Sequence, residues 1–185
     1  MPKSTLYIRE VSLEHNKVVK YRVHYSGEYK GELKTNIHRF KFRKQKDLGC
    51  YFGEHIYKNL PKDYDLSNYD YLLPVPSKPS SISERGYNAV RLIGERLSEL
   101  CGLPLAKDIL EALDRLRQTR VSKVKREQHI KGGFRLICPS RVEGKSFLVL
   151  DDITTTGSTL DEVIRTLSKA APRKLDALVL AKKQH

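Results

Sequence analysis

The chain has 185 residues, 39% of them hydrophobic, which is enough to bury one substantial core and makes a single domain the default. Lysine and arginine number 35 against 22 acidic residues, and the formal charge of +13 favours polyanionic ligands or nucleic acid. The three cysteines (Cys50, Cys101 and Cys138) lack CxxC spacing, so neither a disulfide framework nor a cysteine zinc site is predicted. Because we find no signal peptide and no apolar run of membrane-spanning length, we expect a cytoplasmic protein with no membrane span.

Two segments near the N-terminus predict a β-hairpin. Thr5 to Ser12 and Val18 to Tyr25 are rich in β-branched and aromatic residues, and the second segment alternates apolar with polar side chains. Leu13 to Lys17 would join the two strands. We therefore expect a hairpin extension over residues 1–27, followed by the main domain over residues 28–185.

Helical spacing of apolar residues follows from Glu28 to Phe42, and again from about Lys46 to Asn59. A dense basic run lies where these two predicted helices meet. This run is either a solvated helix end or a surface that contacts the phosphate backbone of nucleic acid. Its candidate nucleic-acid-binding residues are Arg39, Lys41, Arg43, Lys44 and Lys46.

A short apolar strand is predicted from Tyr71 to Val75, and a helix from Tyr87 that ends at Gly102. The segment between them, Ser77 to Gly86, is polar and proline-rich, so we interpret it as a surface loop. In an open α/β sheet, ligands collect at the carboxyl ends of strands, where this loop would lie. Its residues Ser77, Lys78 and Arg85 are candidates for binding a diphosphate, the alternative being ordinary solvated loop side chains.

A second basic segment runs from Arg115 to Lys131, where seven residues are Lys or Arg and Glu127 is the single acid. Such a charge argues against burial. The segment is a mobile cover for a diphosphate, a nucleic-acid surface, or a solvated helix that begins after Ser122. The further diphosphate candidates are Arg120, Lys123 and Arg126.

Three more elements are predicted in the C-terminal part. Phe134 to Ile137 and Leu175 to Ala181 are apolar runs typical of strands, and Phe147 to Leu150 is typical of a central parallel strand buried on both faces. We expect this last strand to stop at Asp151, and a helix to begin near Gly157.

The turn between that strand and helix carries the strongest functional signal. Asp151 and Asp152 accept hydrogen bonds while ionised, so sugar hydroxyls suit them, and they are our catalytic and ribose-binding candidates. Small residues and a helix N-terminus favour a phosphate beside them. An ordinary helix cap is the alternative, but one cap needs one hydroxyl residue. The candidate phosphate-binding residues are Thr154, Thr155, Thr156, Gly157, Ser158 and Thr159.

The segment FLVLDDITTTGST, residues 147–159, resembles the ribose-phosphate loop of type I phosphoribosyltransferases without a gap. The resemblance implies an α/β fold, with a central, mostly parallel sheet flanked by helices and a small N-terminal hairpin extension. It also implies transfer at the anomeric carbon of phosphoribosyl diphosphate (PRPP), or binding of a related ribose 5-phosphate. Mg²⁺ would be held through the ligand and water, with no dedicated metal site on the protein.

A narrower resemblance covers about Tyr25 to Ala181. The segments YLLPVPSKPSSISERGYN, CGLPL, KREQHIKGGF and VLDDITTTGST are similar in order and spacing to the ComF family, which comprises phosphoribosyltransferase-like proteins associated with bacterial competence and DNA uptake. Many ComF proteins carry an N-terminal cysteine-rich zinc ribbon, whereas Met1 to Val23 contains no cysteine.

The basic segments and the two resemblances leave three hypotheses about function. The first, which we favour, is a PRPP pocket combined with single-stranded DNA binding during transformation. The second is an active phosphoribosyltransferase, which needs an acceptor for which the sequence shows no base-recognition signature. The third is a docking component for competence proteins, which would use the N-terminal hairpin as an interaction edge.

Overall fold

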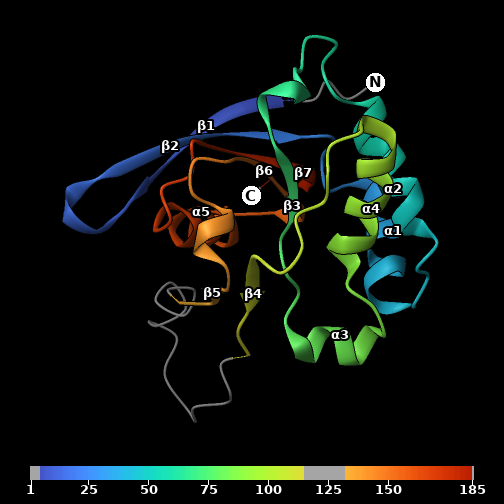
Figure 1. Cartoon of the computed structure of the whole chain (residues 1–185). Coiled ribbons are helices and arrows are strands. Elements are labelled where there is room, and N and C mark those ends of the chain that lie inside the picture. Colours follow the sequence, from blue (N-terminus) through green and yellow to red (C-terminus); the bar gives the residue numbers. More distant parts are fainter. Residues whose placement is uncertain (1–4, 115–131, 185) are drawn as a thin grey trace.

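A computed structural model describes residues 5–114 and 132–184, and its centre is a five-stranded sheet (Figure 1). The strands stand in the order β1-β2-β7-β6-β3, and only β1 runs antiparallel to its neighbour. The mostly parallel sheet that the resemblance implied is thus confirmed. The strands are β1 (Thr5–Ser12), β2 (Val18–Tyr25), β3 (Tyr71–Pro74), β6 (Ser146–Thr154) and β7 (Lys174–Lys182).

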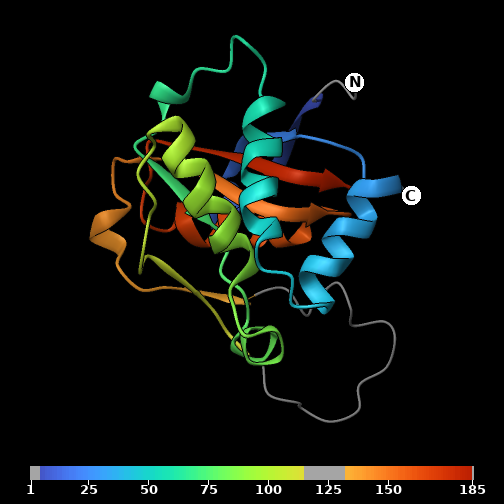
Figure 2. The same cartoon turned by 90° about the vertical axis from the view of Figure 1, so that its right-hand side faces the viewer.

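Helices cover both faces of this sheet. One face carries α1 (Gly31–Phe42), α2 (Leu48–Lys58) and α4 (Ala89–Cys101), and the other carries α5 (Ser158–Ser168), as Figures 1 and 2 show. Apolar side chains of β6 alternate between the two resulting cores, because Phe147 packs on the α5 side and Leu148 on the α4 side. None of the described helices has the length and apolarity needed to cross a bilayer.

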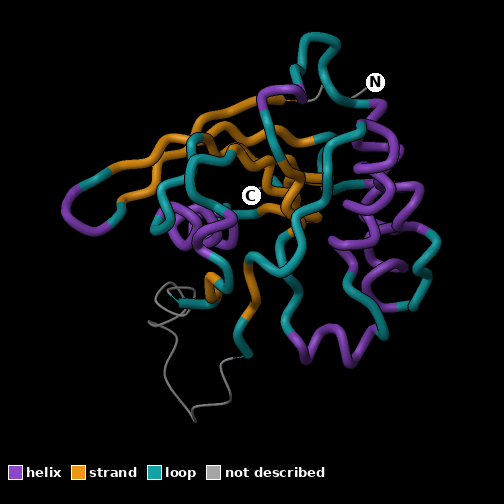
Figure 3. Tube along the Cα trace, viewed as in Figure 1, coloured by secondary structure: helices purple, strands orange, loops and turns teal. Residues whose placement is uncertain are grey.

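A smaller unit lies at one end of the sheet. It consists of β4 (Leu110–Ala112) paired antiparallel with β5 (Phe134–Leu136), and of the helix α3 (Pro79–Arg85), as Figure 3 shows. The interpretation of residues 77–86 as a loop was wrong. Proline favours the first helical turn and Gly86 adopts φ 86° at the C-cap, so this polar segment forms a short helix.

The N-terminal hairpin forms over the residues predicted for it, and its second strand continues the main sheet. Residues Val23 to Tyr25 of β2 pair with β7. The carboxylate of Asp176, in β7, reinforces this junction from a site that is 3% exposed. It accepts hydrogen bonds from the Arg22 backbone N–H at 2.7 Å, from Arg22 Nη2 at 2.9 Å and from the Tyr69 hydroxyl at 2.7 Å.

The central strand β6 is longer than expected. The prediction that it stops at Asp151 was wrong, because the strand continues through Ile153 to Thr154. The neighbouring strand supplies the reason. β7 offers partners at this end of the sheet, and Ile153 pairs with Ala181 and Thr154 with Lys182. Both acids therefore stand on the rigid end of a buried strand.

Candidate functional site

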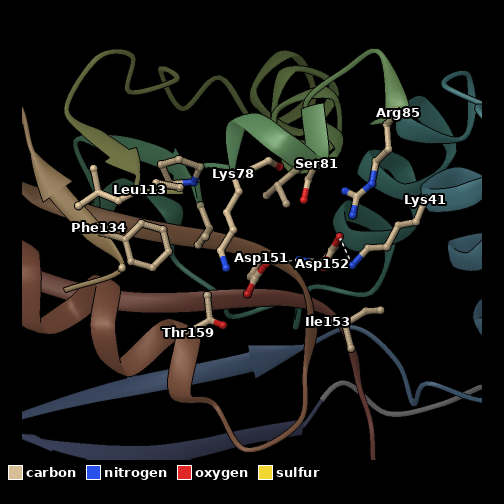
Figure 4. A pocket seen from close by; sticks show the side chains of 16 residues that line it. Lys41, Lys78, Ser81, Arg85, Leu113, Phe134, Asp151, Asp152, Ile153 and Thr159 are labelled. Atoms are coloured by element: carbon tan, nitrogen blue, oxygen red, sulfur yellow. Dashed lines mark hydrogen bonds and ion pairs between the residues drawn. The ribbon is translucent and has the colours of Figure 1, made fainter. Parts of the chain in front are cut away.

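The candidate site lies where β3 and β6 end side by side. Pro74 is the register partner of Leu150, and the Val75 N–H donates to the Leu150 carbonyl oxygen at 2.8 Å. Because parallel strands point the same way, the segments that follow them leave the same edge of the sheet. Between them lies a pocket of about 660 Å³ (Figure 4). Its polar lining residues are Lys41, Ser77, Lys78, Ser81, Arg85, Asp151, Asp152 and Thr159.

The two acids differ in their surroundings, although each is 6% exposed. Asp152 forms an ion pair with Lys41, whose Nζ lies 2.8 Å and 2.7 Å from the two carboxylate oxygens. Asp151 accepts the backbone N–H of Asp152 at 2.8 Å. Burial and the neighbouring Asp152 charge raise the pKa of Asp151 to about 7, and Lys41 opposes this rise. The protonated form of Asp151 is therefore favoured to a higher pH than that of an ordinary aspartate.

Lys41 reaches this pocket from α1. The helix buries Ile37 and Phe40, and Lys41 follows four residues after Ile37, at the margin of the buried face. Its side chain is 18% exposed and points at Asp152 in Figure 4. Among the predicted nucleic-acid residues, Lys41 therefore lies in the pocket, and the spacing of four from Ile37 is the signal that could have placed it there.

The predicted phosphate loop joins β6 to α5. Gly157 adopts φ 82° at the N-cap, a conformation that glycine takes without strain, and no side chain caps the helix there. Thr155, Thr156 and Thr159 are exposed, and the hydroxyls of Thr156 and Ser158 lie 2.6 Å apart. Thr154 is buried instead, with no hydrogen-bond partner for its hydroxyl among the described residues. The helix N-terminus is thus open beside the two acids.

The opposite wall carries the predicted diphosphate candidates. Ser77, Lys78 and Arg85 line the pocket, and Figure 4 shows Lys78 extending toward Asp151. Arg120, Lys123 and Arg126 lie outside the described residues. Ser81, Leu113 and Phe134 also line the pocket, although they were not predicted as site residues. The last two come from the β4–β5 ribbon, whose first strand was not predicted, since three residues give too short a pattern to detect.

The rest of the first basic run faces away from this pocket. Arg39 and Arg43 line a second groove of about 600 Å³ together with Tyr29, Lys34 and His38. Lys44 and Lys46 are exposed beside it. Phe42 is 64% exposed within this basic surface, and its ring centroid lies 4.8 Å from that of His38. We call this surface the α1 groove.

Comparison with known proteins shows relatives over most of the chain. Competence protein F of Haemophilus influenzae is 27% identical over 161 residues, covering 84% of this chain and 70% of the relative. Competence protein ComFC of Bacillus subtilis is 27% identical over 140 residues, which cover 75% of this chain and 55% of the relative. The DNA utilization protein YhgH of Escherichia coli K12 is 26% identical over 147 residues, with coverage of 76% and 63%. The chain thus spans less than two thirds of the length of ComFC and YhgH.

Some solved structures match part of this chain at low sequence identity. The glutamine PRPP amidotransferase of B. subtilis gives a TM-score of 0.44 at 17% identity, over 74% of this chain and 26% of that one. A hypoxanthine phosphoribosyl transferase of Trypanosoma cruzi gives a TM-score of 0.40 at 16% identity, over 83% of this chain and 66% of that one. A family model for the phosphoribosyl transferase domain matches residues 101–185, which include both acids and the phosphate loop. The chain is thus similar to the competence protein F, ComFC and YhgH proteins, and its residues 101–185 match the phosphoribosyl transferase domain.

Proposed function

We propose that the pocket binds PRPP or a related ribose 5-phosphate and that the protein acts in the handling of DNA during competence. One observation carries the first part. The two acids, Thr159 in the first turn of α5, and the cationic pair Lys78 and Arg85 line a single pocket of about 660 Å³. A ribose that carries a phosphate at one end and a diphosphate at the other needs all three of these chemistries.

Each part of the ligand would meet a matching group. The 5-phosphate would lie in the loop from Thr155 to Thr159, where backbone N–H groups and hydroxyls donate. The ribose hydroxyls would donate to Asp151 and Asp152, and hydrogen bonds to charged groups contribute about 1.5–3 kcal/mol each. The diphosphate would lie against Lys78 and Arg85, on the opposite wall.

The pocket also fits a hard cation such as Mg²⁺, because carboxylate and hydroxyl oxygens are its preferred ligands. Asp151 and the hydroxyl of Ser77 line the cavity and could hold such an ion together with water. Among the residues that the structure describes, no three His, Cys, Asp or Glu side chains gather into a metal site, so most ligands would come from the bound diphosphate. Bound Mg²⁺ would supply positive charge to a departing diphosphate.

A calorimetric titration tests the pocket. PRPP with Mg²⁺ is titrated into the wild type, into the double variant Asp151→Asn, Asp152→Asn, and into Glu143→Gln, a control at an exposed site. We expect saturable binding by the wild type and the control, and loss of binding in the double variant. A wild type that does not bind PRPP would refute the proposal. Where binding is found, release of diphosphate with candidate acceptors decides whether the protein is also a transferase.

The α1 groove favours single-stranded DNA as a second ligand. Arg39, Arg43 and Lys34 supply phosphate-binding charge, and the exposed ring of Phe42 offers a stacking surface for unpaired bases. Duplex DNA keeps its bases stacked and would gain nothing from that ring. The names of the relatives refer to competence and DNA utilization, which agrees with this proposal.

Fluorescence anisotropy with a labelled oligothymidine tests the groove. The double variant Arg39→Ala, Arg43→Ala should weaken binding and reduce the slope of log K against log salt by about 0.7 per lost contact. Phe42→Ala should weaken binding without changing that slope. The control is Lys145→Ala, Lys169→Ala, which removes two exposed charges elsewhere. Equal losses of DNA affinity in the control and in the groove variant would contradict a defined DNA site. The alternative would then be a docking function, in which the exposed edge strand β1 contacts protein partners.

A further inference from the structure

The N-terminal hairpin contacts the first turn of α5 through one carboxylate. Asp161 accepts two hydrogen bonds from Arg9 of β1, from Nε at 2.9 Å and from Nη2 at 2.6 Å. It accepts a third from the Tyr21 hydroxyl of β2 at 2.7 Å. The pair is partly buried, with side-chain exposures of 25% for Arg9 and 21% for Asp161. Two neighbouring strands of the hairpin thus hold the beginning of α5.

The same guanidinium rests against the glycine of the phosphate loop. A Cβ atom built on Gly157 would lie 2.5 Å from Arg9 Cζ and 2.7 Å from Arg9 Nη1. A side chain at residue 157 would therefore displace the Arg9 guanidinium, in addition to straining the backbone at φ 82°. Within residues 5–114 and 132–184, Nη1 has no hydrogen-bond acceptor. Arg9 is therefore positioned by Asp161 and placed directly behind the loop.

This arrangement reduces the repulsion between the Asp161 carboxylate and an anion bound at the N-terminus of α5. An acid in the first turn of a helix is favourable for the helix, but it repels an anion that binds at the same N-terminus. Asp161 lies four residues after Gly157, and Arg9 is its bidentate partner. The ion pair cancels the negative charge of Asp161, and its cationic half is the one that touches the loop.

We propose that Arg9 is a positioning residue for the phosphate end of the pocket, where it neutralises Asp161 and supports Gly157 so that the loop accepts a dianionic phosphate monoester. This inference rests on the proposed function of the pocket. It gives the N-terminal hairpin a part in ligand binding, although none of its residues lines the pocket.

Titration with ribose 5-phosphate tests this role through the sign of each effect. Arg9→Met keeps the aliphatic stem but leaves Asp161 charged and uncompensated, so the affinity should fall by roughly tenfold. Asp161→Asn keeps the bond from Tyr21 and leaves Arg9 as a free cation, so the affinity should stay the same or rise. The double variant should return to within roughly threefold of the wild type. The losses should shrink as salt is raised.

A purely structural clamp predicts a different pattern. Both single variants would then weaken binding, and the double variant would show no recovery, which would overturn the proposal. Inorganic diphosphate with Mg²⁺ serves as a probe for the opposite wall, and its affinity should be unchanged in Arg9→Met. If the wild type does not bind ribose 5-phosphate, the proposed pocket itself is refuted. If the wild type binds it and Arg9→Met binds it equally well, only the role of Arg9 is refuted. Thermal unfolding of each variant verifies that it is folded.

Discussion

The buried carboxyl of Asp151 should make the stability of the protein depend on pH in an unusual direction. Its pKa is raised from 3.8 to about 7 by burial and by Asp152. Between these two values the folded protein keeps the proton and the unfolded chain has lost it. Unfolding then releases a proton, so the free energy of unfolding falls as the pH rises through this range. Most acid groups in proteins act in the opposite sense.

The size of the effect follows from the shift. Each pKa unit corresponds to about 1.4 kcal/mol, so complete ionisation of Asp151 costs roughly 4 kcal/mol. Between pH 5 and pH 8, integration over the titration gives a loss of roughly 2–3 kcal/mol. Asp151→Asn preserves the shape and the acceptor for the Asp152 N–H but cannot ionise. The difference in unfolding free energy between this variant and the wild type should therefore grow by roughly 2–3 kcal/mol, in favour of the variant, from pH 5 to pH 8.

Urea unfolding at pH 5, 6, 7 and 8 measures this difference. The buried His24 and the partly buried His55 also titrate. Desolvation lowers the pKa of each, so their effect is to raise stability as the pH rises. Both histidines are present in wild type and variant, so their contribution cancels in the comparison. Glu143→Gln serves as a control and should track the wild type at every pH. A difference between Asp151→Asn and wild type that stays constant with pH would refute a raised pKa for Asp151.

Three further predictions concern packing and charge. Gly94→Ala should lower the free energy of unfolding by about 1–3 kcal/mol in urea titrations, because its Cβ would lie 2.8 Å from Pro74 Cγ; an unchanged midpoint would contradict this packing. Asp176→Ala should cost about 2 kcal/mol by the same measurement, since four donor groups lose their acceptor; a loss no larger than that of a substitution at an exposed site would argue against this junction. Lys41→Met should raise the Asp151 pKa above about 7 in a carboxyl NMR titration, because the Lys41 charge now lowers it, and a downward shift would refute the ion-pair geometry.

The parts of the fold that the sequence predicted are those with strong, long patterns. The hairpin, α4 and the strand through Leu150 all show continuous alternation, helical periodicity or an unbroken apolar run over several residues. The pocket was predictable for a related reason. Acids and hydroxyls that follow a buried strand have few structural uses, so their accumulation from Asp151 to Thr159 points to a ligand.

The errors arose where the deciding interaction is distant in sequence. The end of β6 depends on β7, which supplies partners for Ile153 and Thr154. The short helix α3 is stabilised by Asp114, whose carboxylate accepts the Ser80 N–H and hydroxyl at 2.8 Å each. Lys41 appeared to be one member of a basic run, and only the packing of α1 against the sheet separates it from Arg39 and Arg43. A local pattern contains no information about such partners.

The place of β7 in the middle of the sheet bears on how the chain folds. β7 stands between β2 and β6, and the contact between Arg22 and Asp176 joins residues that are 154 positions apart. The β1–β2 hairpin can form early from local contacts, but the sheet that it joins is complete only after this strand has arrived. Contacts of such high sequence separation slow folding. Until β7 is inserted, β2 and β6 both present open edges to other chains, so we expect the slow-folding protein to depend on low concentration or on chaperones during refolding.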